Sequence, residues 1–384
     1  MMRKMLMFLP IIGLVASLLS GCEDRNELED LALVMGIGID KTEDQQIQVS
    51  LQFFLPQGSG QSGGSQTQSK GAGGANQSFI ATESGETISD AVNKIAKRMS
   101  RRIYFSHNAV VIIAKKMARR HLNQVIDYCQ RTREIRQRTL LFITDESMPK
   151  ILSYQSVLEK TSSISLMKGE EKHLNLITTI HDVLLMRTRP NQPMALPMIK
   201  IREDSYDPRQ QVTKIVGSVL FANQKMVGMM NPERTMGLLM SNGEFRNNTF
   251  TFKPKGNKGR LSINIQDIQL RAVPTINHGR WQLSIHLSGN GILQENTTVL
   301  NPLNARDRRR IEQQTEAYLA SLITKGFKQS QHVGSDVYMT YEVFERSYPR
   351  ECQRAREHWA TVYPNIHLSV HPQIQLLHSG ASNS

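Results

Sequence analysis

Ala32-Leu-Val-Met-Gly-Ile-Gly-Ile-Asp40 is an apolar run typical of a β-strand. A second such run, Ile47-Gln-Val-Ser-Leu-Gln-Phe-Phe-Leu55, follows after the polar residues 41–46. The pattern predicts two strands joined by a turn. Strand character resumes at residues 79–83.

Helical and strand patterns alternate over the next sixty residues. Residues 87–99 and 118–130 carry apolar side chains at helical spacing, whereas residues 103–114 and 139–144 are apolar in the manner of buried strands. The order β-β-α-β-α-β predicts a mixed sheet with helices packed on it. Helices are also expected at 148–158 and near 174–185, followed by a strand at 198–202 after the breakers Pro190, Pro193 and Pro197.

Two polar segments suggest the organisation of the chain. Residues 57–78 consist mostly of Gly, Ser and Gln and predict a flexible loop inside the sheet, with an interdomain linker as the alternative. Residues 204–211 are polar, contain a proline and lack periodicity, which favours a domain boundary. We therefore expect an N-terminal α/β region at 22–203 and a C-terminal region at 204–384, the latter divisible into two smaller domains.

The second half mixes hairpins with helices. Strands at 215–221 and 225–230 flank a short turn, and residues 232–240 form a predicted helix with Asn231 as its N-cap and Pro232 at its first position. Further strands are expected at 250–252, 261–273, 281–287 and 366–376, with a long charged helix at 304–324 and a helix near 351–361. The predicted class is α+β, with several domains, mixed sheets and packed helices, preceded by a lipoprotein signal peptide.

The first 22 residues have the layout of an export signal. Arg3 and Lys4 precede an apolar run at 5–19, and Leu19-Ser-Gly-Cys22 closes it. The run is shorter than the ~20 residues that span a bilayer, so a signal peptide at 1–21 is expected, with a plain signal anchor as the alternative. The last four residues resemble the lipobox of bacterial lipoproteins. This resemblance implies cleavage between Gly21 and Cys22, and an N-palmitoyl, S-diacylglycerol cysteine at Cys22.

Charge and composition indicate which class of partner to expect. The chain has 384 residues, of which 39% are hydrophobic and 21% charged, and its formal net charge is +13. The basic residues are scattered, apart from clusters such as 131–138 and 306–310, and no aromatic-interleaved motif accompanies them. We therefore expect electrostatic contact with a membrane or a partner rather than with nucleic acid.

No catalytic, cofactor or metal site is expected. Gly36-Ile-Gly-Ile-Asp40 is half of a dinucleotide loop without the following helix, so close packing of strand glycines is the better account. His367 and His371 share a strand face but lack a third ligand, and His107 is expected at a strand entrance. There is no Gly-x-Ser-x-Gly elbow, so an enzyme is not predicted.

Besides Cys22, the chain contains only Cys129 and Cys352. Two cysteines make no disulfide framework, although they could pair in an oxidising compartment. Cys129 lies on a helical pattern and is expected as a buried free thiol.

Several segments together resemble the GerC family, the lipoprotein components of nutrient germinant receptors in spores. Near the N-terminus these are Cys22-Glu-Asp-Arg-Asn-Glu-Leu28, Leu31-Ala-Leu-Val-Met-Gly-Ile-Gly-Ile-Asp40 and Ser106-His-Asn-Ala-Val-Val-Ile-Ile-Ala114. Later segments are Gly217-Ser-Val-Leu-Phe221, Glu233-Arg-Thr-Met-Gly-Leu-Leu239, Trp359 and Gly380. The chain departs from the family in having Glu23 instead of a tryptophan, and Val337-Tyr-Met-Thr340 instead of a stretch rich in Phe and Gly.

The resemblance implies a non-enzymatic subunit with a mixed α/β fold, held by the lipid on Cys22 at the extracytoplasmic face of the spore inner membrane. It further implies polytopic A and B subunits as partners. Our hypothesis is that this chain serves as an external scaffold that docks on the extracytoplasmic faces of these partners. The alternative is a lipid-anchored solute-binding protein that delivers a small molecule to a transporter. That alternative predicts a deep cleft between two similar lobes, which the differing patterns of the two halves disfavour.

Overall fold

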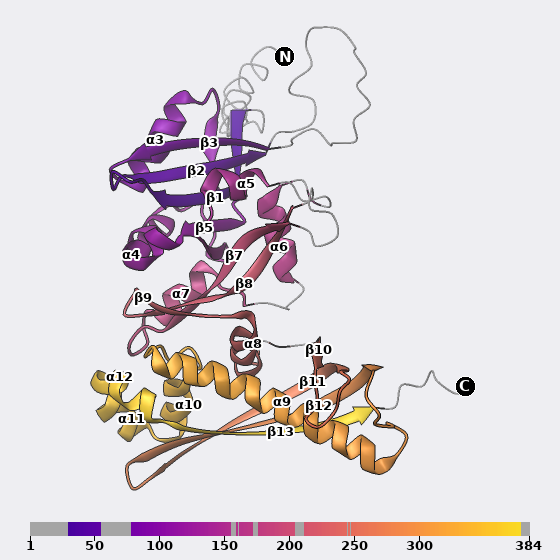
Figure 1. Ribbon diagram of the computed structural model, residues 1–384. Coiled ribbons are helices and arrows are strands. Elements are labelled where there is room, and N and C mark those ends of the chain that lie inside the picture. Colours follow the sequence, from indigo (N-terminus) through magenta and orange to yellow (C-terminus); the bar gives the residue numbers. More distant parts are fainter. Residues whose placement is uncertain are drawn as a thin grey trace, which may run out of the picture.

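The computed structural model describes residues 30–54, 78–154, 159, 161–171, 176–203, 211–243, 245 and 247–377. Figure 1 shows a part built on a nine-stranded sheet above a second part built on a four-stranded sheet. Both sheets are mixed and both carry helices, so the predicted α+β class is confirmed. Across these residues no helix is both long and apolar enough to span a bilayer.

The large sheet joins strands from the first 230 residues. Its strands are β1 (Leu31–Lys41), β2 (Ile47–Phe54), β3 (Ser78–Gly85), β4 (Arg102–Tyr104), β5 (Val110–Ala114), β6 (Leu140–Thr144), β7 (Met194–Glu203), β8 (Gln211–Ala222) and β9 (Lys225–Met230). The order is β3-β2-β1-β5-β6-β7-β8-β9, with β4 paired to β1. The central strands β1, β5, β6 and β7 are parallel, and the strands on either side are antiparallel.

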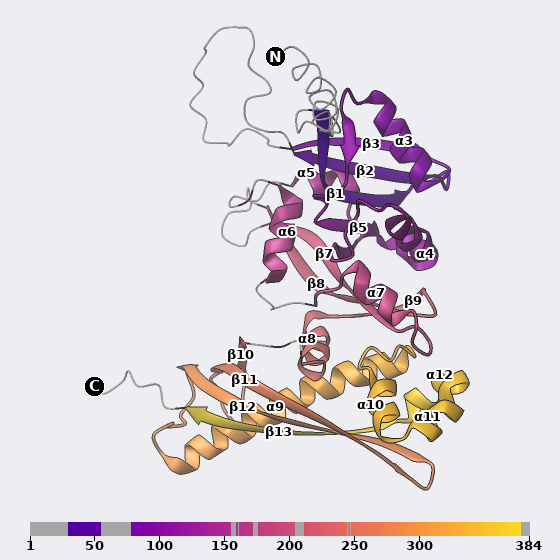
Figure 2. The same ribbon diagram turned by 180° about the vertical axis from the view of Figure 1, so that it is seen from behind.

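Helices cover both faces of this sheet, which explains why its central strands are continuous apolar runs. They are α3 (Ile88–Arg98), α4 (Lys115–Arg131), α5 (Met148–Ser153), α6 (Ser162–Glu171) and α7 (Ile180–Met186). Helices α3 and α4 contact each other on one side, and α5 and α6 contact each other on the other side (Figures 1 and 2). Val110, Val111, Ile112 and Ile113 of β5 are therefore completely buried.

The predicted strand at 103–114 is two strands, so that prediction is wrong in detail. A turn, in which the Asn108 amide donates to the Phe105 carbonyl, separates β4 from β5. The Phe105 amide donates to the Glu134 carboxylate, and this bond keeps it out of the sheet ladder. Both short strands pair with β1, one after the other. Helix α6 also lies where the sequence pattern predicts no helix.

The strand predicted at 198–202 starts earlier than expected, because Pro197 does not interrupt it. Strand β7 begins at Met194 and runs through Pro197, which is paired with Ser218 of β8. The register shifts directly afterwards, between Pro197 and Ile199, as expected for a proline tolerated at a bulge. The preceding helix is also shorter than predicted, since α7 starts at Ile180 behind the N-cap Thr179.

The β7–β8 pair lies on both sides of residues 204–210, which are outside the described residues. Gln211 of β8 pairs with Glu203 of β7, so the large sheet continues beyond this segment. A domain boundary at residue 204 stays a prediction. The predicted signal peptide at 1–21, the lipidation site Cys22 and all but the last residue of the predicted loop at 57–78 also lie outside the described residues.

The C-terminal part is a long twisted sheet with one dominant helix. After α8 (Pro232–Ser241) come β10 (Asn247–Phe252), β11 (Leu261–Asn277), β12 (Arg280–Asn296), α9 (Ala305–His332), α10 (Thr340–Ser347), α11 (Pro349–Ala355), α12 (Trp359–Val362) and β13 (His367–Leu377). Short 3-10 turns cover Arg356–His358 and Tyr363–Asn365. The order is β10-β11-β12-β13, with β13 parallel to β12. The predicted N-cap Asn231 is confirmed and Asn304 also caps its helix, since each side chain accepts amide hydrogens of the helix that follows.

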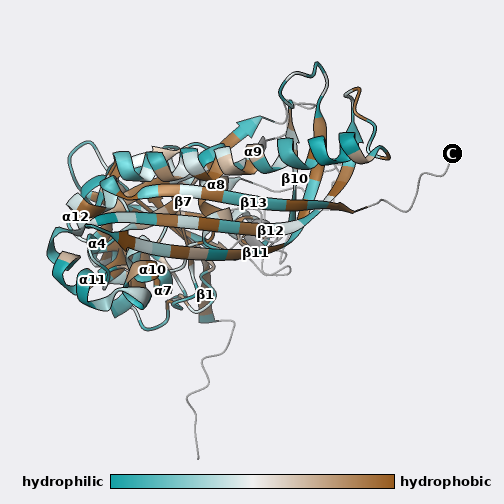
Figure 3. Ribbon diagram, turned by 90° about the horizontal axis from the view of Figure 1, so that it is seen from below, coloured by the Kyte–Doolittle hydropathy of each residue, from teal (hydrophilic) through white to brown (hydrophobic). Residues whose placement is uncertain are grey.

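Helix α9 covers one face of the four-stranded sheet and leaves the other face open (Figure 3). Its buried stripe, including Ile311, Leu319 and Phe327, packs on Ile285 of β12 and Ile374 of β13 in one apolar core. The outward residues of β12 and β13 are polar. This alternation fits a sheet with one packed and one solvated face.

Candidate functional site

The two parts of the molecule meet in a hydrogen-bonded junction. The Ser335 hydroxyl donates to the Phe221 carbonyl at 2.6 Å, and the Asn191 side chain donates to the Gly334 carbonyl at 2.6 Å. Arg189 and Glu342 form an ion pair at 2.5 Å with both side chains largely buried. The loop after α9 is thereby fixed against β8 and against the turn before β7.

A cavity of about 440 Å³ lies at this junction. Its size falls within the range of small-molecule pockets. Its lining comes from the β6–β7 connection, from the end of α8 and from the segment before α10: Leu176, Ile177, Thr178, Asp182, Leu185, Met186, Arg189, Pro193, Ala195, Leu238, Asn242, Gly243, Asp336, Val337 and Met339. Asp182 and Arg189 of the lining already have protein partners, since the Asp182 carboxylate accepts the amide of the N-cap Thr179 and Arg189 pairs with Glu342.

Asp336 is the most perturbed acid at the junction. Its carboxylate accepts the amides of Thr340 and Tyr341 at 3.0 Å and the indole N–H of Trp359 at 2.8 Å. Burial raises its pKa to about 7 against the opposing effect of these donors. The arrangement ties the start of α10 to α12, so we interpret Asp336 as an organising residue of the C-terminal part.

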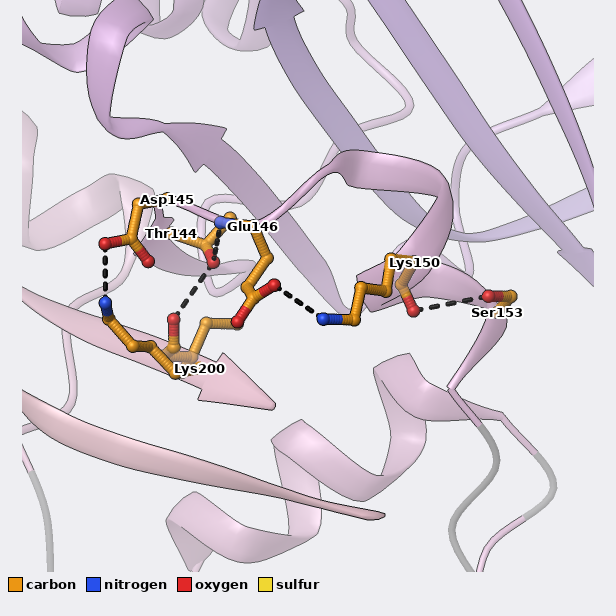
Figure 4. A network of polar contacts seen from close by, with 7 residues as sticks. Thr144, Asp145, Glu146, Lys150, Ser153 and Lys200 are labelled. Carbon is orange, nitrogen blue, oxygen red and sulfur yellow. Dashed lines mark hydrogen bonds and ion pairs between the residues drawn. The ribbon is translucent and has the colours of Figure 1, made fainter. Parts of the chain in front are cut away.

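A second polar network lies at the end of β6 (Figure 4). The Lys200 ammonium contacts the Asp145 carboxylate at 2.6 Å, and Lys150 contacts Glu146 at 2.8 Å. The Thr144 hydroxyl donates to the Ile199 carbonyl at 3.0 Å. Ligands of open α/β sheets usually bind beyond the carboxyl ends of the parallel strands. Here the polar groups at that position pair with one another and join β6 to β7 and α5.

Two of the three histidines singled out from the sequence lie on the open face of the four-stranded sheet. His367 and His371 are exposed on β13, and the ring of His371 stacks on His286 of β12 with centroids 5.1 Å apart. His286 could not be assigned to this pair from sequence spacing, because the contact depends on the β12–β13 register. Among the described residues, no three or more His, Cys, Asp or Glu side chains converge as metal ligands would. His107 is exposed at the turn between β4 and β5.

The two cysteines beyond Cys22 do not pair with each other. Cys129 on α4 and Cys352 on α11 are both buried free thiols, which confirms the expectation for Cys129. Burial raises the pKa of Cys129 to about 12 and that of Cys352 to about 11. Neither is an activated nucleophile, because the thiolate is the reactive form.

The glycines of β1 serve packing. A Cβ on Gly36 would lie 2.1 Å from the Ser163 Oγ of α6, and one on Gly38 would lie 3.0 Å from Met148 of α5. Residues 41–46 form the β1–β2 turn rather than a helix start. The interpretation of these glycines as packing residues is confirmed.

Comparison with known proteins identifies the family of the chain, which the geometry alone does not. The family model described as "Spore germination protein N-terminal domain" matches residues 24–201, and "Spore germination B3/ GerAC like, C-terminal" matches residues 216–380. The chain belongs to the GerC family of spore germination proteins. Membership supports a role as a subunit of a germinant receptor.

Relatives in Bacillus subtilis (strain 168) extend over nearly the whole chain. Spore germination protein KC is 23% identical, with 100% of this chain and 98% of the relative covered. YndF is 22% identical, covering 99% and 98%, and the putative spore germination protein YfkR is 27% identical over 74% of each chain. The crystal structure of the GerBC protein superposes with a TM-score of 0.58 at 16% identity, covering 89% of this chain and 97% of that chain. The GerBC match shows that the fold is shared.

Cys22, the only functional residue predicted individually, lies outside the described residues, so its lipidation stays a prediction. The junction around Asp336 was not found from the sequence. The available signal was weak: one acid within an otherwise uncharged segment, with its indole partner more than twenty residues further along the chain.

Proposed function

We propose that this GerC-family chain is the lipid-anchored, extracytoplasmic subunit of a nutrient germinant receptor. It acts as a non-enzymatic scaffold on which polytopic A and B subunits assemble at the spore inner membrane. The observation that carries this proposal is the match of two consecutive spore-germination family models to residues 24–201 and 216–380.

The structure supports a scaffold through its junction. Contacts such as Ser335 to Phe221 and Arg189 to Glu342 join the large sheet to the C-terminal part. Two surfaces joined in this way keep a fixed spacing, which suits a protein that holds two partners at once. The long solvated face of β11–β13 offers polar area for such contacts.

The anchor is tested with Cys22→Ala. We expect the wild-type chain to fractionate with membranes of cells that lack its partner subunits, and the variant to lose this anchored fraction. Washing the membranes with high salt removes electrostatic attachment before the measurement. A Cys129→Ala chain is the matched control, because that thiol is buried in the folded body. Unchanged fractionation of Cys22→Ala after the salt wash would exclude the lipid anchor.

The solute-binding alternative is tested by calorimetry on residues 23–384 with nutrient amino acids and sugars. The junction cavity of about 440 Å³ is large enough for such molecules, but it is lined mainly by α7, the end of α8 and connecting segments rather than by two similar lobes. The scaffold proposal predicts no tight binding to the isolated chain. Saturable tight binding that is lost on filling the cavity with Ala195→Trp would favour the alternative.

A further inference from the structure

Two basic segments that lie far apart in the sequence meet at one end of the four-stranded sheet. Residues 253–260 join β10 to β11, and residues 297–310 join β12 to α9 and include the first six residues of that helix. The Thr297 amide donates to the Arg260 carbonyl at 3.0 Å, and the Arg260 amide donates to the Thr297 hydroxyl at 2.8 Å. Figure 3 shows the loops at this end beside the hydrophilic start of α9. We call these two segments the basic tip.

The basic tip concentrates the positive charge of the chain. It contains one acid, Asp307, and eight basic residues: Lys253, Lys255, Lys258, Arg260, Arg306, Arg308, Arg309 and Arg310. All of these basic residues except Arg308 are exposed. Arg309 is partly neutralised by Glu312 at 3.3 Å and by Glu316 at 3.7 Å. The 22 residues of the tip carry a formal charge of +7, more than half of the +13 of the chain.

The arginines at the start of α9 oppose the electrostatic preference of a helix N-terminus. The N-terminus of an α-helix carries a partial positive charge and favours acidic residues in its first turn. Helix α9 instead has four arginines among its first six residues. Residues that depart from such a local preference are expected at functional positions.

Two aliphatic side chains project from the same tip. Val299 is 91% exposed and Leu303 is 76% exposed, the highest values among the large apolar residues of the described chain. The loop that carries them is ordered by hydrogen bonds, because the Asn296 side chain donates to the Leu300 carbonyl at 2.7 Å and the Leu303 amide donates to Asn301 at 3.0 Å. Leu300 between them is buried. The fold therefore holds Val299 and Leu303 outward.

We propose that the basic tip is a second membrane contact, which binds an anionic phospholipid surface and inserts Val299 and Leu303 into it. Clustered basic residues attract anionic headgroups, and apolar side chains beside them enter the boundary between headgroups and acyl chains. The contact is separate from Cys22. Strand β1, the first strand after Cys22 in the sequence, lies in the other part of the molecule from the basic tip (Figures 1 and 2). If the lipid on Cys22 and the basic tip contact the same bilayer, the long dimension of the protein lies along the membrane surface.

A lipid surface fits the tip better than an acidic protein does. Hot spots of protein interfaces are usually aromatic residues or arginines set in packed pockets. The tip has no aromatic residue in residues 253–260 or 297–310, and its arginines other than Arg308 are exposed rather than set in pockets. Its two exposed apolar side chains project singly from a loop. Four of its basic residues lie on a loop that contains Gly256 and Gly259. Basic side chains on such a loop can contact lipid headgroups in many arrangements, so the surface does not need a partner of one defined shape.

The test uses residues 23–384, which keep every described element and both hydrophobic cores but lack Cys22. The protein is sedimented with vesicles of phosphatidylcholine alone or with 30% phosphatidylglycerol. We expect binding to the anionic vesicles only, weakening at least tenfold between about 0.05 and 0.3 M salt because the charges are exposed. Failure of this binding leaves the Cys22 anchor of the intact chain unaffected, so the two proposals fail separately.

Paired variants locate the contact. Lys255→Glu with Lys258→Glu, and separately Val299→Ser with Leu303→Ser, are each expected to weaken anionic binding about tenfold or more. Lys97→Glu with Arg101→Glu makes the same change in net charge on exposed residues around the end of α3. Leu185→Ser with Val227→Ser removes two other exposed apolar side chains. Both control pairs are expected to bind as the unmodified chain does.

The fluorescence of an attached dye reports whether residue 303 inserts into the membrane. Leu303→Cys labelled with an environment-sensitive fluorophore is expected to shift to the blue on anionic vesicles, whereas the same label at Val227→Cys is not. The native Cys129 and Cys352 are buried and leave the label specific. Equal loss of binding in tip and control variants, or no shift at residue 303, would overturn the proposal. So would binding to immobilised polyglutamate without binding to vesicles, which would assign the tip to an acidic protein.

Discussion

Asp336 illustrates how one buried residue organises the C-terminal part. Its carboxylate accepts two amides at the start of α10 and the Trp359 indole, and no described basic side chain forms an ion pair with it. Burial disfavours its charged form, so its pKa rises to about 7. An acid with a raised native pKa links folding to proton binding.

The raised pKa of Asp336 predicts how the free energy of unfolding changes with pH. The native state holds the Asp336 proton up to about pH 7, whereas the unfolded chain releases it near pH 4, so wild-type stability declines as pH rises through this window. Relative to Asp336→Asn, which does not titrate, the wild type should lose up to about 4 kcal/mol of unfolding free energy between pH 4 and 7. Denaturant unfolding at several pH values measures the difference. Asp44→Asn, which changes an exposed acid in the β1–β2 turn, is the control, and a pH-independent difference for Asp336→Asn would contradict the assignment.

Gly36 shows a residue role that the sequence did reveal. A Cβ there would lie 2.1 Å from Ser163 Oγ and 3.2 Å from Ser163 Cβ. We expect Gly36→Ala to cost about 1–3 kcal/mol by overpacking. Adding Ser163→Ala removes the closest atom, so the double variant should recover part of the loss beyond additivity. Thermal unfolding of both single variants and the double variant measures the coupling, and simple additivity would refute the packing role.

At the scale of elements, the crossing of α8 and α9 depends on small residues. A Cβ on Gly237 of α8 would lie 2.2 Å from the Leu322 carbonyl oxygen, and one on Gly326 of α9 would lie 2.7 Å from that of Arg234. Both of these carbonyl oxygens belong to the backbone, so neither can move without shifting a helix. The Cβ on Gly326 would also lie 2.2 Å from the Tyr338 hydroxyl, which is a side-chain atom. The two helices therefore pack more closely than larger side chains allow.

This packing predicts a stability change opposite in sign to helix propensity. Propensity alone would make Gly237→Ala stabilising by about 1 kcal/mol. We expect a net destabilisation of about 1–3 kcal/mol, because α8 must move away from α9. Chemical denaturation measures the sign. A more stable Gly237→Ala protein would show that the helices are not in close contact.

Elements with strong local signals could be predicted from the sequence. Asn231 before Pro232 marked the start of α8, and the 215–230 hairpin was recognised from its turn, where Asn223 and Gln224 both have positive φ. Elements set by distant contacts could not. The division of residues 103–114 depends on Glu134, and β7 accommodates Pro197 because the register shifts there. Helix α6 has a weak apolar stripe, so its sequence did not indicate a helix.

For the whole molecule, the family could be predicted because its segments are spread over the entire chain in a fixed order. The basic tip could not, since residues 253–260 and 297–310 are brought together by the pairing of β10, β11 and β12. The same holds for the junction, where Ser335 bonds to Phe221 across more than a hundred residues of sequence. Sequence patterns report local structure, whereas these surfaces arise from strand register.

We propose above that this chain assembles with polytopic receptor subunits at the spore membrane. The most direct test is affinity purification of the chain, tagged after Ser384, from spore membranes solubilised in mild detergent, with the co-purifying proteins quantified by mass spectrometry. We expect polytopic A-type and B-type subunits in near-stoichiometric amounts, with both reduced when Asp336→Ala disrupts the C-terminal part. Recovery of the chain from these membranes without any polytopic partner would contradict this assembly.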